Sequence, residues 1–254
     1  MSTVKYYDWS YHQARTRPNK VAVKEVSTGR ETTYGQLEER SCRLASWLQN
    51  KGVKKGDRVA ILIHNCTEVF ELEFACAKIG AIELPLNWRL TKPELEYILN
   101  DSSPEVLIYG SNFADTAKAL TKDCSIKNSL EIDDEDQNNE YEQALKENID
   151  FDVVETTHDD LIMLMYTSGT TGHPKGAMIT HEMQFYNIVN LAGSSRVTDK
   201  TVQLIVLPLF HTGGMNCYAN PILHYGGQIV LMKEFDPGKA LEIIDDPDYG
   251  ITHF

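Results

Sequence analysis

The chain has 254 residues and a mass of 28.7 kDa, and 42% of its residues are hydrophobic. A chain of this length and composition can bury a substantial core, which excludes a wholly disordered protein. The formal net charge is −13, and no cluster of Lys and Arg with interleaved aromatic residues occurs, so we expect no nucleic-acid partner.

The acidic side chains are concentrated in one stretch. Residues 131–160 hold thirteen of them and one base, Lys146, and we interpret this stretch as a solvated surface excursion or linker. The N-terminus lacks the apolar core of a secretory signal, and no run of 18 or more apolar residues is present. The five cysteines form no C-x-x-C pair and are expected to be free thiols. We therefore expect a cytoplasmic protein without a membrane-spanning helix.

The first half of the chain alternates short β-rich runs with helical patterns. Thr33-Tyr34-Gly35-Gln36 has the form of a capping box and predicts a helix that runs toward Asn50. A second capped helix is predicted to start at Thr91-Lys92-Pro93-Glu94. Lys78, in the helix predicted for 67–78, is expected on a solvated face. Strands are predicted at 21–23, 58–63, 81–84 and 106–109.

The second half repeats this rhythm. The continuous apolar run 161–166 predicts a strand that is buried on both faces. A helix is predicted from His181, and further elements at 202–207 (strand), 215–225 (helix), 228–232 (strand) and 237–244 (helix). Residues 249–254 resemble the opening of another strand, and we expect that the chain is truncated there. The alternation predicts an α/β fold with a mainly parallel sheet flanked by helices.

The segment from Leu164 to Gly176 is the most specific one for chemistry. It begins at the end of a predicted buried strand and contains Lys175, three glycines and the hydroxyl groups of three threonines and one serine, Thr167, Ser168, Thr170 and Thr171. Glycines let backbone N–H groups approach phosphate oxygens, hydroxyls donate further hydrogen bonds, and the lysine supplies a positive charge. A loop just beyond the carboxyl end of a strand is also where ligands bind in open α/β sheets. The segment therefore predicts a polyphosphate site, with a surface turn rich in Gly, Ser and Thr as the alternative.

This segment is not a Walker loop. That motif needs Gly-x-x-x-x-Gly-Lys followed by Ser or Thr, whereas Pro174 precedes Lys175 and Gly176 follows it. No hydroxyl residue follows the lysine to hold magnesium. A P-loop NTPase is therefore excluded on spacing.

The order of residues resembles the signature of the AMP-forming adenylating superfamily, which contains acyl-CoA synthetases, peptide-synthetase adenylation domains and firefly-type luciferases. Three other segments are similar to shorter motifs of this superfamily and occur in the same order: 33–37, 77–86 and 207–211. The resemblance covers nearly the whole chain. It implies that the chain is the N-terminal portion of the AMP-binding domain, residues 1–254, with the C-terminal domain absent.

The resemblance also implies an activity and its co-substrates. Enzymes of this family make an acyl adenylate from a carboxylic acid and ATP with Mg²⁺, and then pass the acyl group to a thiol. By resemblance, the pyrophosphate moiety of ATP would be bound by Thr167, Ser168, Gly169, Thr170, Thr171, Gly172 and Lys175. A protein ligand for Mg²⁺ would lie beyond residue 254, so no metal ligand is expected in this chain.

Two segments resemble acid–CoA ligases in particular, Leu86-Asn87-Trp88-Arg89-Leu90 and Phe210-His211-Thr212-Gly213-Gly214. They imply CoA as co-substrate and a fatty or aromatic acid as substrate. By resemblance, Lys175 and His211 would be catalytic, and His211, Gly213 and Gly214 would bind the acid. The alternative for His211 is a residue that closes a turn or caps a helix, and a helix-start turn is equally compatible with the two glycines.

The chain by itself is expected to be inactive, because the adenine- and ribose-binding segments and the mobile C-terminal domain of such enzymes would follow Phe254. Two alternatives to a CoA ligase stay open. One is an adenylating enzyme that loads the thiol of a carrier protein, and the other is a non-catalytic module that binds a nucleotide or an acyl group. The sequence does not define the oligomeric state.

Overall fold

A computed structural model describes residues 4–133, 136, 138–146, 150–167 and 173–254. The chain divides into two compact units, which are described separately. The first contains residues 1–6, 40–63 and 71–181, and the second contains residues 7–39, 64–70 and 182–254. The division falls within two helices, α2 (Tyr34–Asn50) and α3 (Thr67–Ile79).

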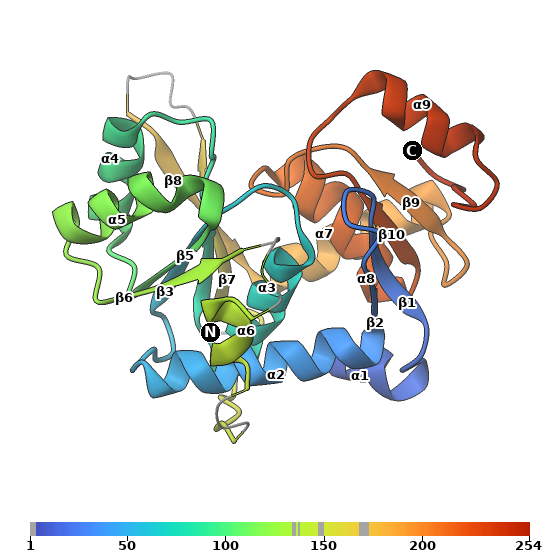
Figure 1. The fold of residues 1–254 in the computed structure, drawn as a ribbon. Helices are drawn as coiled ribbons and strands as arrows, with labels where there is room; N and C mark the ends of the chain where they lie inside the picture. The colour runs from blue at the N-terminus through green and yellow to red at the C-terminus, as the bar shows by residue number, and fades with distance from the viewer. Residues whose placement is uncertain (1–3, 134–135, 137, 147–149, 168–172) are drawn as a thin grey trace. The chain divides into compact units, whose positions relative to one another are not determined.

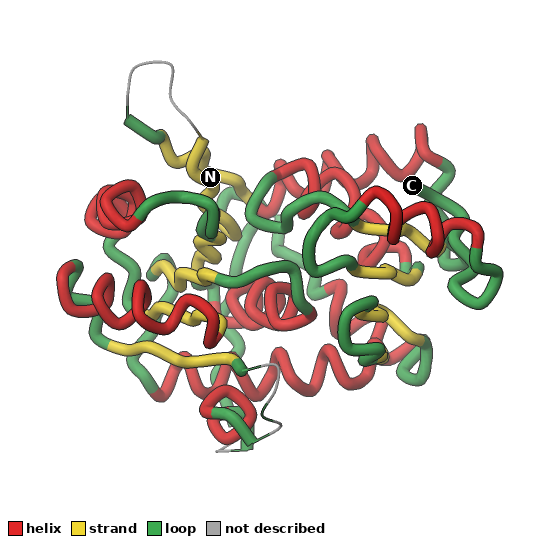
Figure 2. The backbone as a smooth tube through the Cα atoms, turned by 45° about the horizontal axis from the view of Figure 1, so that its top comes forward, coloured by secondary structure: helices red, strands yellow, loops and turns green. Residues whose placement is uncertain are grey.

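The first unit is built on a six-stranded sheet with the order β6-β5-β3-β4-β7-β8. All neighbouring strands are parallel except β7 and β8, which form an antiparallel pair. Figure 1 labels these strands, and Figure 2 shows them among helices. Their bounds are β3 (Arg58–Leu62), β4 (Ile82–Pro85), β5 (Val106–Gly110), β6 (Asn128–Ile132), β7 (Leu161–Thr167) and β8 (Lys175–Thr180).

One face of this sheet packs against two helices, α4 (Lys92–Ser102) and α5 (Ala114–Asp123). Successive strand residues point to opposite faces, so alternate residues of three strands enter the same core. The core members from the strands are Ala60, Leu62, Leu84, Leu107 and Tyr109, with Leu86 directly after β4, and those from the helices include Leu95, Ile98, Leu99, Ala117 and Leu120. A short 3₁₀ turn, Ser111–Phe113, leads from β5 into α5.

Charged side chains are buried along α3 and on β4. Glu83 of β4 is fully buried, and Glu71 and Glu73 of α3 are 0% and 3% exposed. Lys78, at the end of the same helix, is 4% exposed, so the expectation that it lies on a solvated face is wrong. The helix is covered on nearly all sides, and its charges do not mark a solvent-facing stripe.

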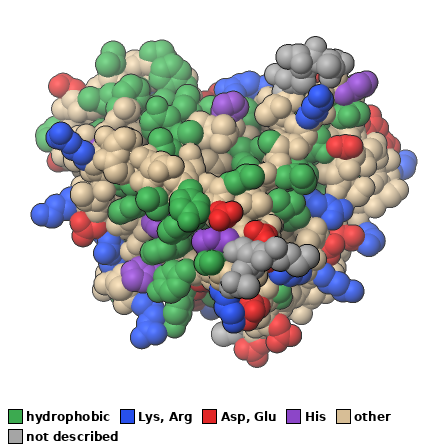
Figure 3. All heavy atoms as spheres, turned by 180° about the vertical axis from the view of Figure 1, so that it is seen from behind, with side chains coloured by type: hydrophobic (Ala, Val, Ile, Leu, Met, Phe, Trp, Pro, Cys, Tyr) green, Lys and Arg blue, Asp and Glu red, His purple; other side chains and the backbone are tan. Residues whose placement is uncertain are grey.

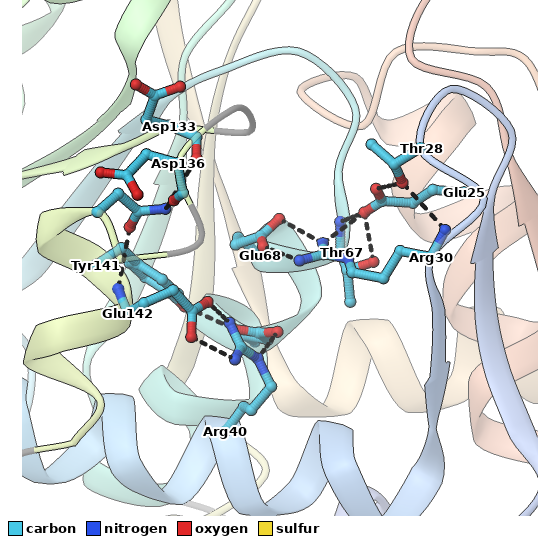
Figure 4. A network of polar contacts seen from close by, with 12 residues as sticks. Glu25, Thr28, Arg30, Arg40, Thr67, Glu68, Asp133, Asp136, Tyr141 and Glu142 are labelled. Atoms are coloured by element: carbon cyan, nitrogen blue, oxygen red, sulfur yellow. Dashed lines mark hydrogen bonds and ion pairs between the residues drawn. The ribbon is translucent and has the colours of Figure 1, made fainter.

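The acidic stretch is folded where the structure describes it. It contains the end of β6 and a short helix, α6 (Glu140–Ala144), whose Tyr141 is 1% exposed. The Arg40 guanidinium donates to Glu71 and, through two nitrogens, to Glu142 of α6 at 2.6 and 3.0 Å (Figure 4). The Tyr141 hydroxyl donates to Glu71 at 2.7 Å. Ion pairs and a buried aromatic ring therefore fix α6 within the first unit.

The second unit contains a four-stranded sheet with the order β2-β1-β10-β9, in which only β2 is antiparallel to its neighbour. Its strands are β1 (Val21–Glu25), β2 (Glu31–Thr33), β9 (Val202–Ile205) and β10 (Gln228–Leu231). Its helices are α1 (Trp9–Thr16), α7 (His181–Ser195), α8 (Asn220–Tyr225), α9 (Pro237–Asp245) and a π-helix, η2 (Gly213–Ala219). Leu204, Val230 and Met232 pack against Ala240 and Ile243 of α9.

Both predicted capping boxes are present. The Thr33 hydroxyl accepts from the Gln36 N–H at 3.2 Å, and the Gln36 side chain accepts from the Thr33 N–H at 2.9 Å. Thr91 and Glu94 form the reciprocal pair at the start of α4, where the Glu94 carboxylate accepts from the Thr91 N–H at 2.8 Å. These helices begin where the sequence places them because the capping groups lie within four residues of each other.

The predicted fold class is confirmed, and several element predictions are corrected. The sequence did not predict α1, β2, α5, β6, α6 or β8. β7 is only partly buried, with Leu161, Leu164 and Tyr166 retaining exposure, because its neighbour β8 forms the edge of the sheet. In the segment 249–254, which the sequence analysis compared to the opening of a strand, His253 forms an isolated parallel bridge with Gln203 of β9.

No helix among the described residues has the length and apolar character needed to cross a membrane. The five cysteines are all free, as predicted. Large apolar side chains are exposed on α7 (Met183 and Tyr186) and on α9 (Leu241 and Ile244), and Figure 3 shows apolar atoms at the surface of one face.

Candidate functional site

The predicted phosphate-binding segment connects β7 to β8 at the edge of the first sheet. Thr167, the last residue of β7, is the register partner of Lys175, the first residue of β8. The Thr167 hydroxyl lies 3.5 Å from the Lys175 carbonyl oxygen, to which it donates. The other predicted contacts of this segment, Ser168, Gly169, Thr170, Thr171 and Gly172, lie outside the described residues. The structure therefore brings together the two ends of the predicted site.

Lys175 begins a strand rather than lying within a loop. Gly176 to Thr180 continue the antiparallel pairing with β7, and the β-branched residues Ile179 and Thr180 at its end were the available sequence signal. The Lys175 side chain is exposed. Within the described part of the chain, no carboxylate forms an ion pair with its ammonium group. A cation at the mouth of a hairpin beside a threonine hydroxyl suits a polyanionic ligand.

Gly176 has no side chain, and this leaves room for two side chains of β7. A Cβ atom built on Gly176 would lie 2.8 Å from Leu164 Cδ1 and 3.2 Å from the Tyr166 ring. Tyr166 is the register partner of Gly176, so its ring lies across the glycine. The glycine that follows the lysine thus has a packing role in the hairpin.

The second predicted group of site residues lies at the start of η2 in the second unit. The His211 N–H donates to the Pro208 carbonyl at 3.2 Å, and His211 Nδ1 accepts from the Gly213 N–H at 3.1 Å. Because Nδ1 is an acceptor, the neutral imidazole carries its proton on Nε2. The His211 side chain is exposed. This ring both closes a turn and presents an N–H group.

The two glycines after His211 differ in whether a side chain would fit at their position. A Cβ atom on Gly214 would lie 2.3 Å from the Pro208 carbonyl oxygen, whereas the closest atom to a Cβ on Gly213 would be His211 Nδ1 at 3.3 Å. Gly214 is therefore required for the close approach of η2 to the preceding segment. The helix predicted for 215–225 in fact begins at Gly213 as a π-helix, a conformation that occurs often at functional sites.

A cavity of about 420 Å³ lies beside η2 within the second unit. Two residues of η2 that the sequence analysis did not assign to a site, Cys217 and Tyr218, line it together with Leu191, Val197, Gln203 and Ile222. Their position three and four residues after Gly214, about one helical turn, was the signal that could have identified them. Polar side chains also line the cavity (Ser195, Gln203, Thr252 and His253), so it can hold a group with both apolar and polar parts.

The hairpin belongs to the first unit and His211 to the second. In the described residues, no group of three or more His, Cys, Asp or Glu side chains could hold a metal ion. The fold is that of an α/β protein in which the two described ends of the predicted phosphate-binding segment are paired at one sheet edge.

Residues 10–254 match the AMP-binding enzyme family, and the chain belongs to this family. It is 37% identical to the feruloyl-CoA synthase of an Amycolatopsis species over 237 residues, which cover 93% of this chain and 46% of that protein. It is 34% identical to the long-chain-fatty-acid–CoA ligase FadD13 of Mycobacterium tuberculosis over 242 residues, which cover 95% of this chain and 48% of that protein.

Among solved structures, the chain is similar to ATP-bound MatB from Rhodopseudomonas palustris. The TM-score is 0.83 at 28% identity, and the match covers 93% of this chain and 47% of that one. The chain thus spans about half the length of the curated relatives it matches.

Proposed function

We propose that the protein activates a carboxylic acid, fatty or aromatic, as an AMP-forming acid–CoA ligase, and that this chain supplies its phosphate-binding hairpin and part of its acid-binding site. The observation that carries the proposal is the pairing of Thr167 with Lys175 at the mouth of the β7–β8 hairpin, in a chain of the AMP-binding enzyme family. Relatives named for an aromatic acid and for long-chain fatty acids support the substrate class.

In the proposed reaction, a carboxylate oxygen attacks the α-phosphorus of ATP, the bond to the bridging oxygen breaks, and pyrophosphate leaves. A thiolate then attacks the acyl carbon, and AMP leaves. Charge develops on the departing pyrophosphate, and a fixed cation with hydroxyl and N–H donors stabilises it. We assign this role to Lys175, to Thr167 and to Ser168, Gly169, Thr170, Thr171 and Gly172.

His211, Gly213 and Gly214 are proposed to bind the acid. The exposed imidazole, with its proton on Nε2, can donate to a carboxylate oxygen or to the acyl carbonyl. The adjacent cavity beside η2 can take the organic part of the acid. Mg²⁺ is the usual counter-ion of ATP, and we assign it no ligand in this chain. The location proposed remains cytoplasmic, because the reaction consumes ATP and CoA.

The test is acid-dependent ATP–pyrophosphate exchange with short, medium, long and aromatic acids. It is run on this chain, after circular dichroism has shown it folded, and on the longest open reading frame that contains it. We expect exchange from the longer product with one acid class and none from the 254-residue chain alone. Exchange from this chain would contradict its proposed inactivity, and would still name the acid class.

A further pair of measurements separates the alternatives. CoA and a carrier-protein thiol are offered as acyl acceptors, and ATP binding is measured by titration calorimetry. Transfer to the carrier protein alone would replace the CoA ligase with a carrier-loading enzyme. ATP binding without exchange by any product would identify a non-catalytic module, and the absence of ATP binding would overturn the proposal.

A further inference from the structure

One helix of the first unit, α4, contacts both sides of the phosphate-binding hairpin. The hydroxyl of Tyr166, one residue before the end of β7, donates to the Asp101 carboxylate. The Tyr97 ring stacks on the imidazole of His173, two residues before β8, with ring centroids 4.9 Å apart and planes inclined by 22°. Tyr97 and Asp101 are four residues apart and so lie on the same side of the helix. Figure 1 shows α4 beside β8.

The Tyr166 contact is directed by packing as well as by its hydrogen bond. The ring lies across Gly176, where a Cβ atom would come within 3.2 Å of it, and Tyr166 packs against the core between the sheet and α4. Burial, followed by the hydrogen bond to Asp101, raises the pKa of Tyr166 above its usual range. The hydroxyl therefore stays protonated and continues to donate throughout the neutral range.

The helix that makes these contacts is itself firmly held. Leu95, Ile98 and Leu99 are at most 2% exposed and belong to the same core. Its first turn is closed by the Thr91–Glu94 capping box, and Lys92 forms an ion pair with Asp123 of α5 at 2.6 Å. A helix fixed at its start and along its buried face can serve as a rigid support for a hairpin at the sheet edge.

We propose that Tyr97 and Asp101 are positioning residues for the phosphate site. They fix the two sides of the β7–β8 hairpin and thereby place Thr167 and Lys175 for the phosphates of ATP. The inference rests on the proposed function, because it assumes that the hairpin binds ATP. Neither residue was singled out in the sequence, since both belong to a helix about seventy residues before the hairpin.

The test combines a measurement that needs no nucleotide with one that does. Tyr97→Leu removes the ring, and Asp101→Ala removes the acceptor. Tyr97→Phe keeps the ring, and Asn100→Ala changes an exposed neighbour in the same turn of α4. Amide hydrogen exchange is followed in the peptides that contain β7 and β8. The affinities for ATP and for inorganic pyrophosphate are measured by titration calorimetry, and circular dichroism gives the unfolding midpoint.

We expect Tyr97→Leu and Asp101→Ala to accelerate exchange in β7 and β8 and to weaken ATP and pyrophosphate binding by about tenfold, which equals about 1.4 kcal/mol. Tyr97→Phe and Asn100→Ala should resemble the parent in both measurements. If Tyr97→Phe restores ATP binding and slow exchange, and Tyr97→Leu unfolds at a similar midpoint, the ring acts by positioning the hairpin and not through general stability.

Three results would overturn the inference. Unchanged exchange in Tyr97→Leu and Asp101→Ala would show that α4 does not hold the hairpin. Faster exchange with unchanged ATP affinity would show that the held position does not matter for binding. A folded parent chain that binds neither ATP nor pyrophosphate would instead reject the proposed function, and with it the positioning role, whatever the exchange rates show.

Discussion

The ammonium group of Lys175 is the cation proposed to face the phosphates of ATP. We expect Lys175→Ala to weaken pyrophosphate binding by roughly ten- to a hundredfold, because a charge-assisted hydrogen bond contributes about 1.5–3 kcal/mol. Titration calorimetry with ATP and with pyrophosphate measures the loss. Lys200→Ala, at an exposed lysine of the other unit, is the matched control. An unchanged affinity in Lys175→Ala would count against the phosphate role of this residue.

A second prediction concerns the buried carboxyl group of Glu83. The residue is fully buried, and in the described part of the chain neither of its oxygens has a hydrogen-bond partner. Burial and then the neighbouring Glu73 raise the pKa of Glu83 well above its ordinary value. The folded chain therefore holds a proton that the unfolded chain releases above about pH 4.3, so this residue destabilises the fold increasingly as pH rises from there.

Glu83→Gln, which is neutral at every pH, should accordingly raise the free energy of unfolding at pH 7 by roughly 1–3 kcal/mol. The gain should shrink as pH falls toward about 4. Urea unfolding followed by circular dichroism at several pH values measures this. Glu155→Gln, at an exposed surface ion pair, should change little. A destabilised Glu83→Gln at pH 7 would show that the carboxyl group has a partner that needs its charge.

At the scale of elements, Arg40 connects α2 to α3 and α6 within the first unit (Figure 4). Burial lowers the pKa of its guanidinium, but the Glu71 and Glu142 carboxylates more than offset this and raise the pKa above the usual value. Glu71 is 0% exposed, so its charge depends on Arg40 and on the Tyr141 hydroxyl. A charge buried without its partner is far more costly than the absence of both.

We therefore expect Arg40→Met to lower the free energy of unfolding by about 3–5 kcal/mol, because it removes the cation that donates to the buried Glu71 carboxylate and to Glu142. The double variant Arg40→Met/Glu71→Gln should recover part of this loss. Arg15→Met, at an exposed position of α1, is the control for loss of an arginine stem. Urea unfolding measures the free energy of unfolding of the parent and of the three variants. A double variant less stable than Arg40→Met would contradict this explanation.

At the scale of the whole chain, two histidines should set its acid sensitivity, one in each unit. Burial lowers the pKa of His181 to about 4, against the smaller raising effect of Asp160, with His158 and Lys55 lowering it further. Burial, and then His12, lowers the pKa of His224 to about 4. The His181 ring contacts Tyr6 with ring centroids 4.2 Å apart, and the His224 ring contacts Trp9 with centroids 3.8 Å apart; both pairs are tilted.

Both imidazoles are neutral in the folded chain above about pH 4, whereas the unfolded chain takes up protons below about pH 6.5. The stability that they contribute is thus fully present above pH 6.5 and is lost as pH falls toward 4, by roughly 1–3 kcal/mol for each residue. Unfolding is best followed in the Glu83→Gln background, since Glu83 acts in the opposite direction over this range.

His181→Phe and His224→Phe should each make the free energy of unfolding less dependent on pH between about 6.5 and 4. His173→Phe, at an exposed position, should leave the dependence as in the parent. If the free energy of unfolding still falls steeply at acid pH in both buried-histidine variants, other groups are responsible for the acid sensitivity.

Local features of the fold could be predicted from the sequence, and features set by distant partners could not. The capping boxes at Thr33 and Thr91 lie within four residues, so the sequence is sufficient to place these helix starts. Lys78 was misplaced because a charged residue usually faces solvent, whereas α3 is covered on nearly all sides. The sequence analysis did not predict β8 because this strand comes directly after a glycine-rich segment, and such a segment usually indicates a loop.

The candidate site shows the same division. The order of hydroxyls, glycines and Lys175 is local, so the family could be recognised from it and the phosphate-binding segment predicted. Three other features become visible only in the folded chain: β1 pairs with β10, some 200 residues away, Glu83 is buried, and α4 contacts residues on both sides of the hairpin. These three features depend on which distant segments pack together and exclude water when the chain folds. A short pattern of residues does not specify such packing.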